Sequence, residues 1–221
     1  MNILPVYNYL SAEERFKCRT VCREWRLLVT FPELGIPLTE LLLKMELLTV
    51  QIFHIFRIDP KNCFSIATRL QKVNLLTKEN ITSIKTSRLG LSLVLKYLDK
   101  SNILNQISYQ TVIEKKNLYQ LRLGTSILRS AEILTENNFF MLAAHKDPRT
   151  LATCFALLHT AGILNDEIKE HLRNCSKAVL ELLKEAFEKL QEKNMLTEAN
   201  VKISLTHARK DQITWLIDNL P

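Results

Sequence analysis

From residue 39 onward, hydrophobic and polar positions recur in one order, in which an apolar residue and a leucine stand directly before a threonine or an asparagine. The copies are Leu47-Leu48-Thr49, Leu75-Leu76-Thr77, Ile103-Leu104-Asn105, Ile133-Leu134-Thr135, Ile163-Leu164-Asn165 and Met195-Leu196-Thr197. Their central leucines are separated by 28, 28, 30, 30 and 32 residues. A second leucine precedes each central one by six positions, as Leu42, Leu70, Leu98, Leu128, Leu158 and Leu190. A period of this size indicates stacked supersecondary units.

The threonine or asparagine that ends each copy predicts the start of a helix, because these side chains cap helix N-termini. Carboxylates follow in the first turn, where they favour the helix dipole. They are Glu79, Glu136, Asp166, Glu167 and Glu198. An apolar residue commonly follows within the next turn and a half, as in Phe53, Ile81, Tyr109, Phe139 and Val201. The apolar pair before the cap can act as a hydrophobic staple.

Proline marks a second boundary within the repeat. Pro60 and Pro148 each follow an aspartate, and each lies sixteen residues before the next central leucine. Proline breaks a helix that would run through it, so a turn is predicted there, before a second helix that ends at the next motif. Each unit is therefore predicted to be a helix–turn–helix hairpin. Residues 37–221 are expected to form about six such units of 28–32 residues in an α-solenoid-like domain.

The last two predicted helices have the clearest apolar faces. Residues 176–193 place Val179, Leu180, Leu183, Ala186, Phe187 and Leu190 on one face. Residues 207–220 place Ile213, Leu216, Ile217 and Leu220 on one face. Trp215 lies off that face, either as a cover over a neighbouring residue or as an exposed contact.

The N-terminal segment follows a different pattern. Ser11 is a natural N-cap and Glu14 completes a capping box, so a helix is predicted to start near Ala12. Phe16 and Val21 stand five residues apart, which does not fit one continuous helical stripe. Two short helices with a break near residues 19–20 are therefore expected.

The same segment resembles an F-box. Residues 6–11, Val-Tyr-Asn-Tyr-Leu-Ser, match the middle of the family pattern, and Val21-Cys22 with Trp25 supplies its V-C-x-x-W element in register. The resemblance implies a three-helix F-box over residues 1–36 that presents apolar side chains to Skp1. A segment this short cannot bury them by itself. The implied Skp1-binding residues are Val6, Tyr7, Tyr9, Leu10, Phe16, Val21, Cys22, Trp25 and Leu28.

Two positions depart from the F-box pattern. The Leu-Pro pair of the family stands further upstream of Leu10 than Leu4-Pro5 does, and Arg15 occupies a position that is usually apolar. The first departure predicts a first helix that is truncated at its N-terminus. The two departures together predict a smaller docking surface and weaker affinity for Skp1. The alternative is that the apolar residues of this segment pack on the rest of the chain as an ordinary helical cap.

Composition supports an all-α chain. The 221 residues include only four glycines and six prolines, which leaves little room for hairpins or long loops. No segment is apolar and long enough to predict a membrane span or a signal peptide. Five unpatterned cysteines indicate a reducing compartment.

The net charge of +7 is uneven along the chain. Residues 37–130 carry fourteen basic and six acidic side chains, whereas residues 131–221 carry eleven basic and thirteen acidic ones. A basic middle suits an acidic protein partner or a nucleic acid. Lysines that solvate the outer faces of helices explain the same charge without a partner.

No pattern of catalytic or ligand-binding residues stands out. His171 and Cys175 share a helix face but lack two further ligands for a metal site. Cys154 and His159 are five residues apart, which points them to different faces. The glycines are isolated, and Gly162 is interpreted as a helix stop. No catalytic residue, cofactor or metal is therefore predicted.

The F-box resemblance, together with the repeats that follow it, implies a non-catalytic substrate adaptor of an SCF ubiquitin ligase. Residues 1–36 would dock on Skp1, and through it on cullin-1 and the RING subunit, while residues 37–221 bind an unidentified target protein. The repeats loosely resemble those in effectors of intracellular bacteria of the Legionella type. A cytoplasmic location is expected, in the host cell if the protein is such an effector.

Two alternative functions are compatible with the same sequence. One is a helical-repeat interaction scaffold that is not associated with a ubiquitin ligase. The other is a nucleic-acid binder that uses the basic middle, which ranks last because aromatic and basic residues are not interleaved as in known reading motifs.

Overall fold

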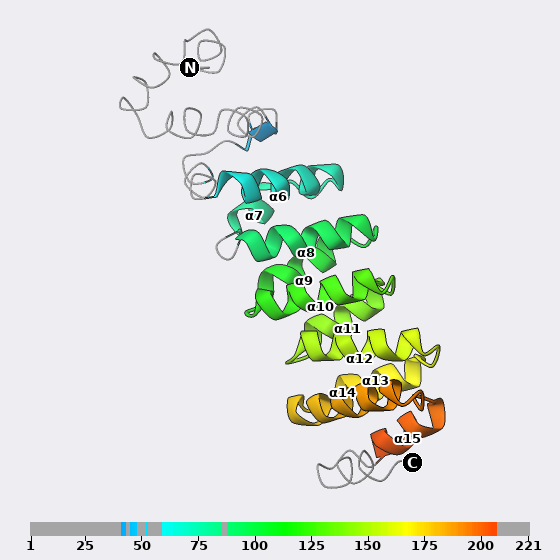
Figure 1. Cartoon of the computed structure of the whole chain (residues 1–221). Helices are drawn as coiled ribbons and strands as arrows, with labels where there is room; N and C mark the ends of the chain where they lie inside the picture. The colour runs from blue at the N-terminus through cyan, green and yellow to red at the C-terminus, as the bar shows by residue number, and fades with distance from the viewer. Residues whose placement is uncertain (1–40, 43–44, 48–51, 53–58, 85–87, 207–221) are drawn as a thin grey trace, which may run out of the picture. The chain divides into compact units, whose positions relative to one another are not determined.

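The structure is a computed structural model that describes residues 41–42, 45–47, 52, 59–84 and 88–206. All regular elements in these ranges are α-helices, which confirms the predicted all-α fold class. Figure 1 follows them in chain order. The helices are α6 (Pro60–Lys72), α7 (Lys78–Thr82), α8 (Arg88–Lys100), α9 (Gln106–Glu114), α10 (Leu118–Ser130), α11 (Glu136–Ala144), α12 (Pro148–Thr160), α13 (Asp166–Asn174), α14 (Lys177–Glu192) and α15 (Glu198–Thr206).

Several predictions from the sequence lie outside the described residues. They are the F-box helices, the domain boundary at residues 36–37, the apolar position of Phe53 and the helix over 207–220 with Trp215. The predicted helix over residues 176–193 is present as α14, whose buried side chains include Leu180, Leu183, Ala186, Phe187 and Leu190.

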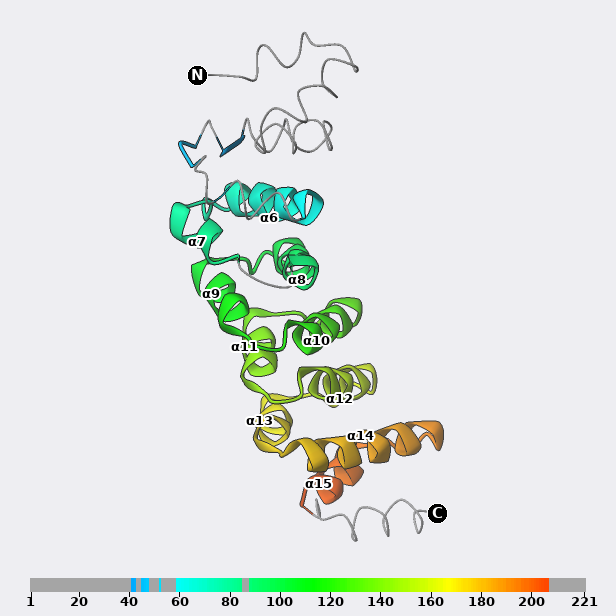
Figure 2. The same ribbon diagram turned by 90° about the vertical axis from the view of Figure 1, so that its left-hand side faces the viewer.

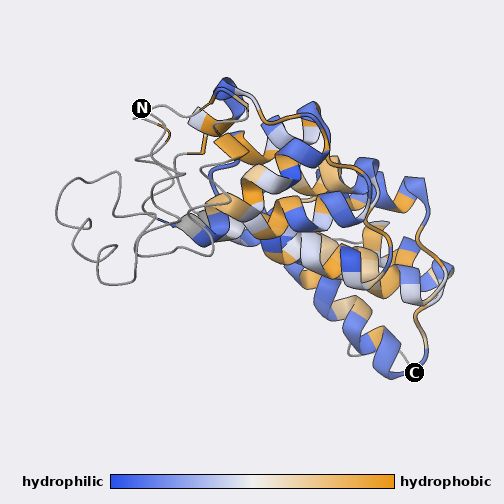
Figure 3. Ribbon diagram, turned by 90° about the horizontal axis from the view of Figure 1, so that it is seen from above, coloured by the Kyte–Doolittle hydropathy of each residue, from blue (hydrophilic) through white to orange (hydrophobic). Residues whose placement is uncertain are grey.

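Long and short helices alternate along the chain, and contacts divide it into two units between Leu95 and Lys96, within α8. In the first unit, α6 and the start of α8 bury Ile66, Leu70, Leu91 and Leu95 almost completely. The Ser92 hydroxyl donates a hydrogen bond to the Ser65 hydroxyl at 3.1 Å, which ties the two helices together. Colouring by hydropathy shows both polar and apolar residues along each helix, as in other amphipathic helices (Figure 3).

In the second unit, α12 packs against both α10 and α14. The long helices α10, α12 and α14 lie on one side of this unit, and the short helices α9, α11 and α13 lie on the other (Figure 2). Phe139, Phe155 and Phe187 are fully buried in its core. A Cβ atom added to Gly124 of α10 would lie 2.7 Å from the Pro148 carbonyl oxygen at the start of α12, so glycine permits the close approach of these helices.

The turn after each long helix explains the six-residue spacing between the paired leucines. At the end of α6, the Leu75 N–H donates to the Leu70 carbonyl oxygen at 2.7 Å, and the Asn74 N–H donates to the Gln71 carbonyl oxygen. Asn74 has a φ of 58°, in the left-handed region. This is the Schellman motif that ends many helices, and it places the buried Leu70 and the apolar Leu75 at the two ends of its longer hydrogen bond.

The same turn recurs at the other described copies. Left-handed residues stand two positions before the central leucine, and they are Glu46, Asn74, Asn102, Glu132, Gly162 and Asn194. The predicted stop at Gly162 is thus confirmed, with a φ of 73°. Across the described copies, the N–H before the central leucine donates to the leucine five residues upstream, over 2.7–3.0 Å. The leucine repeat in the sequence therefore encodes a helix end.

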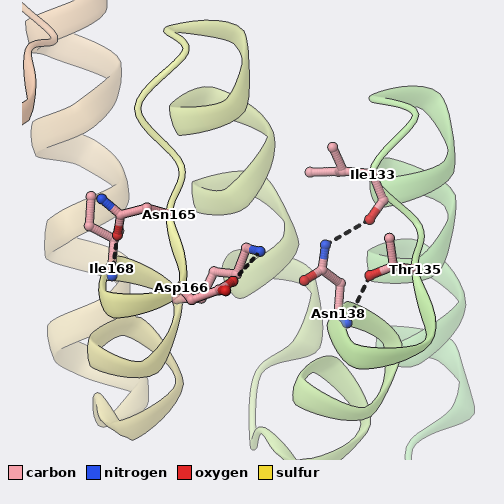
Figure 4. Close-up of polar contacts among 7 residues, drawn as sticks. Ile133, Thr135, Asn138, Asn165, Asp166 and Ile168 are labelled. Atoms are coloured by element: carbon pink, nitrogen blue, oxygen red, sulfur yellow. Dashed lines mark hydrogen bonds and ion pairs between the residues drawn. The ribbon is translucent and has the colours of Figure 1, made fainter.

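The predicted N-caps that fall within the described residues are also confirmed, whereas Ser11 and Thr49 lie outside them. Side-chain oxygens of Thr77, Asn105, Thr135, Asn165 and Thr197 accept a hydrogen bond from the backbone N–H three residues later. Figure 4 shows two of these caps, at Thr135 and Asn165. The aspartate before each proline has the same role at a long helix, since Asp59 caps α6 and Asp147 caps α12. The helix–turn–helix pattern thus follows from local capping chemistry.

A third capping residue was not recognised in the sequence. The Asn138 side chain, three residues after the N-cap Thr135, donates to the Ile133 carbonyl oxygen at 2.8 Å (Figure 4). Asn80 and Asn200 make the equivalent bond at 2.8 Å, and Ser108 makes it through its hydroxyl at 2.9 Å. The bond satisfies a carbonyl of the turn that precedes the short helix, so it ties the first turn of that helix to the preceding turn.

Candidate functional site

The residues implied to bind Skp1 all fall in residues 1–40, outside the described part of the chain. Their geometry as a docking surface therefore stays a prediction. They are Val6, Tyr7, Tyr9, Leu10, Phe16, Val21, Cys22, Trp25 and Leu28. The described residues instead show which surfaces the helical repeats offer to a partner.

The side chains of α8 and α10 that point away from the core form one such surface in the second unit. The Ser126 hydroxyl of α10 donates to the Tyr97 hydroxyl of α8 at 3.3 Å, which joins Tyr97 to α10 within the second unit. Tyr119 is 59% exposed, and the Arg122 guanidinium carbon lies 5.2 Å from its ring centroid. This cation–π contact holds an aromatic ring and a positive charge together at the surface.

A charged hollow of about 590 Å³ lies further along the same unit, over α12 and α14 with Gln120 of α10 at its edge. Its charged lining groups are Asp147, Arg149, Lys177, Glu181, Lys184, Glu185 and Glu188. Within it, Lys177 pairs with Glu181 at 3.6 Å and Lys184 pairs with Glu188 at 3.2 Å. Charges of both signs thus balance along one helix face, which is typical of a solvated surface.

A series of side chains joins the loops that follow successive short helices. The Lys115 ammonium donates to the carbonyl oxygens of Ala143 and His145. The Asp147 N–H donates to His145 Nδ1 at 2.9 Å, so Nε2 carries the proton and donates to the Cys175 carbonyl oxygen at 3.1 Å. Burial lowers the pKa of Lys115, because the charged ammonium loses water contacts.

These three loop residues share one position in the repeat. Lys115, His145 and Cys175 each cap the C-terminus of a short helix, as the end residues of α9, α11 and α13. They are spaced by 30 residues, and that common register was the sequence signal that could have revealed the connection. Their bonds fix each unit of this series to the next.

The other cysteine and histidine pairs of the sequence are not brought together as reactive groups. Cys154 is buried, and burial raises the pKa of its thiol, whereas His159 on the same helix is exposed. The Cys175 thiol donates to the His171 carbonyl oxygen at 3.3 Å, so its hydrogen-bond partner is a backbone oxygen four residues earlier. Within residues 41–206, as far as they are described, no three histidine, cysteine or acidic side chains are grouped to hold a metal ion.

The described helices fall short of the length and hydropathy that a membrane span requires. None of those in the described ranges combines enough residues with enough apolar character to cross a bilayer.

Comparison with known proteins identifies the N-terminal segment. Residues 3–36 match the family model of the F-box domain. No curated protein and no solved structure matches the chain. The match covers the segment in which the Y-L-S and V-C-x-x-W elements stand in register, and the helical units follow it in the sequence. The chain therefore carries an F-box domain at residues 3–36.

Proposed function

We propose that this protein is the substrate-recognition subunit of an SCF-type ubiquitin ligase, in which residues 1–36 dock on Skp1 and residues 37–221 hold a target protein. The observation that carries the proposal is the F-box match at residues 3–36, since an F-box supports a Skp1-binding adaptor role in such ligases. Skp1 links the adaptor to cullin-1 and the RING subunit.

The proposed Skp1 contacts are the apolar residues of the F-box. They are Val6, Tyr7, Tyr9, Leu10, Phe16, Val21, Cys22, Trp25 and Leu28. Large aromatic side chains carry much of the energy of protein interfaces, so Trp25 is expected to be a hot spot, supported by Leu10 and Val21. The short first helix predicted at Leu4-Pro5 is expected to lower the affinity.

The helical units suit the second role, that of positioning a target. Within the described residues, neighbouring helices are connected by Schellman turns and N-caps. They are also connected by the bonds from Lys115 to His145 and from His145 to Cys175. A surface held in this way loses little conformational entropy when a partner binds. The E2 and RING subunits would supply the chemistry of ubiquitin transfer, so this chain would contribute position alone.

Affinity purification from a eukaryotic lysate tests both roles in one experiment. Wild type and Trp25→Ala are compared, with Trp215→Ala as a matched control at the other tryptophan of the chain. We expect Skp1 and cullin-1 to be lost with Trp25→Ala alone, while target proteins are retained by all three. Equal recovery of Skp1 by wild type and Trp25→Ala would contradict the proposal, and would leave an interaction scaffold that works without a ligase.

The proposed location follows from the partners. Skp1 and cullin-1 are proteins of the eukaryotic cell, so the proposed site of action is the cytoplasm, which is the host cytoplasm if the protein is a bacterial effector. Fractionation of cells that express the tagged protein checks this, with co-fractionation of Skp1 as the expected result.

A further inference from the structure

We propose that the target is bound through an acidic segment that carries an apolar side chain, and that the receiving site is the outward surface of α8 and α10. This inference rests on the proposed function and adds to it the site and the chemical class of the partner. The residues that form this α8–α10 surface are Tyr97, Lys100, Tyr119, Arg122, Leu123 and Ile127, all in the second unit.

The first argument is the apolar character of this surface. Tyr119 is among the most exposed large apolar side chains in the described ranges, and Leu123, Ile127 and Tyr97 are only partly buried. The Ser126–Tyr97 hydrogen bond brings the Tyr97 hydroxyl onto α10, next to the positions of Leu123 and Ile127 along that helix. Contiguous exposed apolar area on a soluble surface marks a protein interaction site more often than chance exposure does.

The second argument is the charge around the patch. From Lys96 to the end of α8, and through α10, the basic side chains are Lys96, Lys100, Arg122 and Arg129, and the acidic one is Asp99. Within the described residues, no carboxylate forms an ion pair with Lys96, Lys100 or Arg122. These cations are therefore available to a partner, whereas Lys177 and Lys184 of α14 are already offset by Glu181 and Glu188.

The third argument is the pairing of Arg122 with Tyr119. The guanidinium lies over the ring at 5.2 Å, so packing orders it before any partner arrives. A guanidinium binds a carboxylate through two parallel hydrogen bonds, and a preordered one loses less entropy in doing so. Aromatic residues and arginine are also the residue types enriched at protein interfaces.

A nucleic acid is the less favoured occupant. Four basic side chains are few for strong binding to phosphates, and the aliphatic Leu123 and Ile127 offer no stacking surface for bases. An acidic peptide with a leucine or an aromatic residue uses both the charged and the apolar part of the patch. The α8–α10 surface therefore fits a protein target better than a polynucleotide.

Selection from a phage-displayed random peptide library on the purified full-length chain tests this directly. We expect enrichment of peptides that combine aspartate or glutamate with an apolar residue. A selected peptide, synthesised with a fluorescent label, is then titrated with wild type, Arg122→Glu and Tyr119→Ala. Each substitution is expected to weaken binding about tenfold or more. Lys78→Glu is the matched control, because it makes the same charge change at an exposed residue of α7, and it should bind like wild type.

Enrichment of basic or uncharged peptides, no enrichment, or equal affinity of wild type and Arg122→Glu would overturn the inference. Tighter binding of a labelled single-stranded RNA than of any selected peptide, lost in Arg122→Glu, would overturn it in favour of a nucleic acid. Circular dichroism confirms that each variant is folded.

Skp1 binding, measured on the same proteins, separates the two proposals. Intact Skp1 binding without acidic peptides contradicts the α8–α10 site alone. Peptide binding that is sensitive to Arg122→Glu, in a chain that ignores Skp1, contradicts the ligase role alone.

Discussion

His145 Nε2 lies 3.1 Å from the carbonyl oxygen of Cys175, 30 residues further along the chain. Both residues end short helices of the second unit, so this bond joins the end of α11 to the end of α13. The other ring nitrogen accepts from the Asp147 N–H at 2.9 Å, which holds the ring in a single orientation. One side chain thus holds both the start of α12 and the end of α13 in place.

Replacing this histidine should destabilise the second unit. His145 is 5% exposed, and His145→Ala leaves a buried N–H and a carbonyl without their partners. The expected loss is on the order of 2–6 kcal/mol in the free energy of unfolding, about 1–3 for each of the two unsatisfied groups. Urea unfolding followed by circular dichroism measures it. His159→Ala, at an exposed position of α12, should change stability by less than about 0.5 kcal/mol. Equal effects of the two substitutions would contradict the assigned role of His145.

The asparagine three residues after the N-cap can be tested against its own neighbour. Asn138→Ala removes the bond to the Ile133 carbonyl at a buried site, and should lower the free energy of unfolding by about 1–3 kcal/mol. Asn137→Ala changes the same residue type at an exposed position and should be nearly neutral. Thermal unfolding of the two variants gives the comparison. An Asn138→Ala variant as stable as Asn137→Ala would show that the bond contributes nothing.

The left-handed turn residues predict two substitutions of opposite sign. Glu132 has a φ of 59°, a conformation that glycine adopts more readily, so Glu132→Gly should raise the free energy of unfolding by up to about 1 kcal/mol. At the equivalent position of the next unit, Gly162 has a φ of 73°, and no atom lies within 4 Å of the position that a Cβ would take. Gly162→Ala therefore tests the backbone conformation alone, and it should destabilise by about 1 kcal/mol. Two changes of the same sign in chemical denaturation would contradict the proposed role of these turns.

Gly124→Ala should be costly although alanine favours helices. The added Cβ would lie 2.7 Å from the Pro148 carbonyl oxygen and 2.8 Å from Leu142 Cδ2, so α12 would have to shift away from α10. Overpacking of this kind typically costs about 1–3 kcal/mol, more than the gain of about 1 kcal/mol in helix propensity. Ser130→Ala, at an exposed position in the last turn of α10, is the matched helical control. A lower melting temperature for Gly124→Ala but not for Ser130→Ala is the expected result, and a rise for Gly124→Ala would contradict the close approach.

The local signals in the sequence predicted much of the repeat. Thr135 and Asn165 marked helix starts, Asp147-Pro148 marked a turn and Gly162 marked a helix stop, because caps and turns depend on a few neighbouring residues. The bond from Lys115 to the His145 loop was missed, since it joins residues 30 apart and only the common register of the units connects them. Gly124 stands in no glycine motif of the sequence, and its role could not be predicted because it depends on Pro148 of another helix.

The candidate partner surface likewise combines features that the sequence predicts with features that depend on the packing of helices. The excess of basic residues over 37–130 was visible in the sequence, and so was an acidic protein as one possible partner. What the sequence could not specify was the position of Tyr97 against Ser126, because that contact depends on tertiary packing between helices. Arg122 and Tyr119 are three residues apart on one helix, so their contact could have been predicted from spacing but was not. The F-box domain at residues 3–36 was recognisable from the spacing of its own residues, because the whole motif lies within one short segment.

The central claim, that the F-box makes this protein a Skp1-binding adaptor, is tested most directly by titrating the purified full-length chain with purified Skp1 in a calorimeter. Wild type should bind, and Trp25→Ala should lose on the order of 2–4 kcal/mol of binding free energy, as expected for a buried aromatic hot spot. Trp215→Ala should bind like wild type. The absence of heat with wild type, or equal dissociation constants for wild type and Trp25→Ala, would contradict the claim.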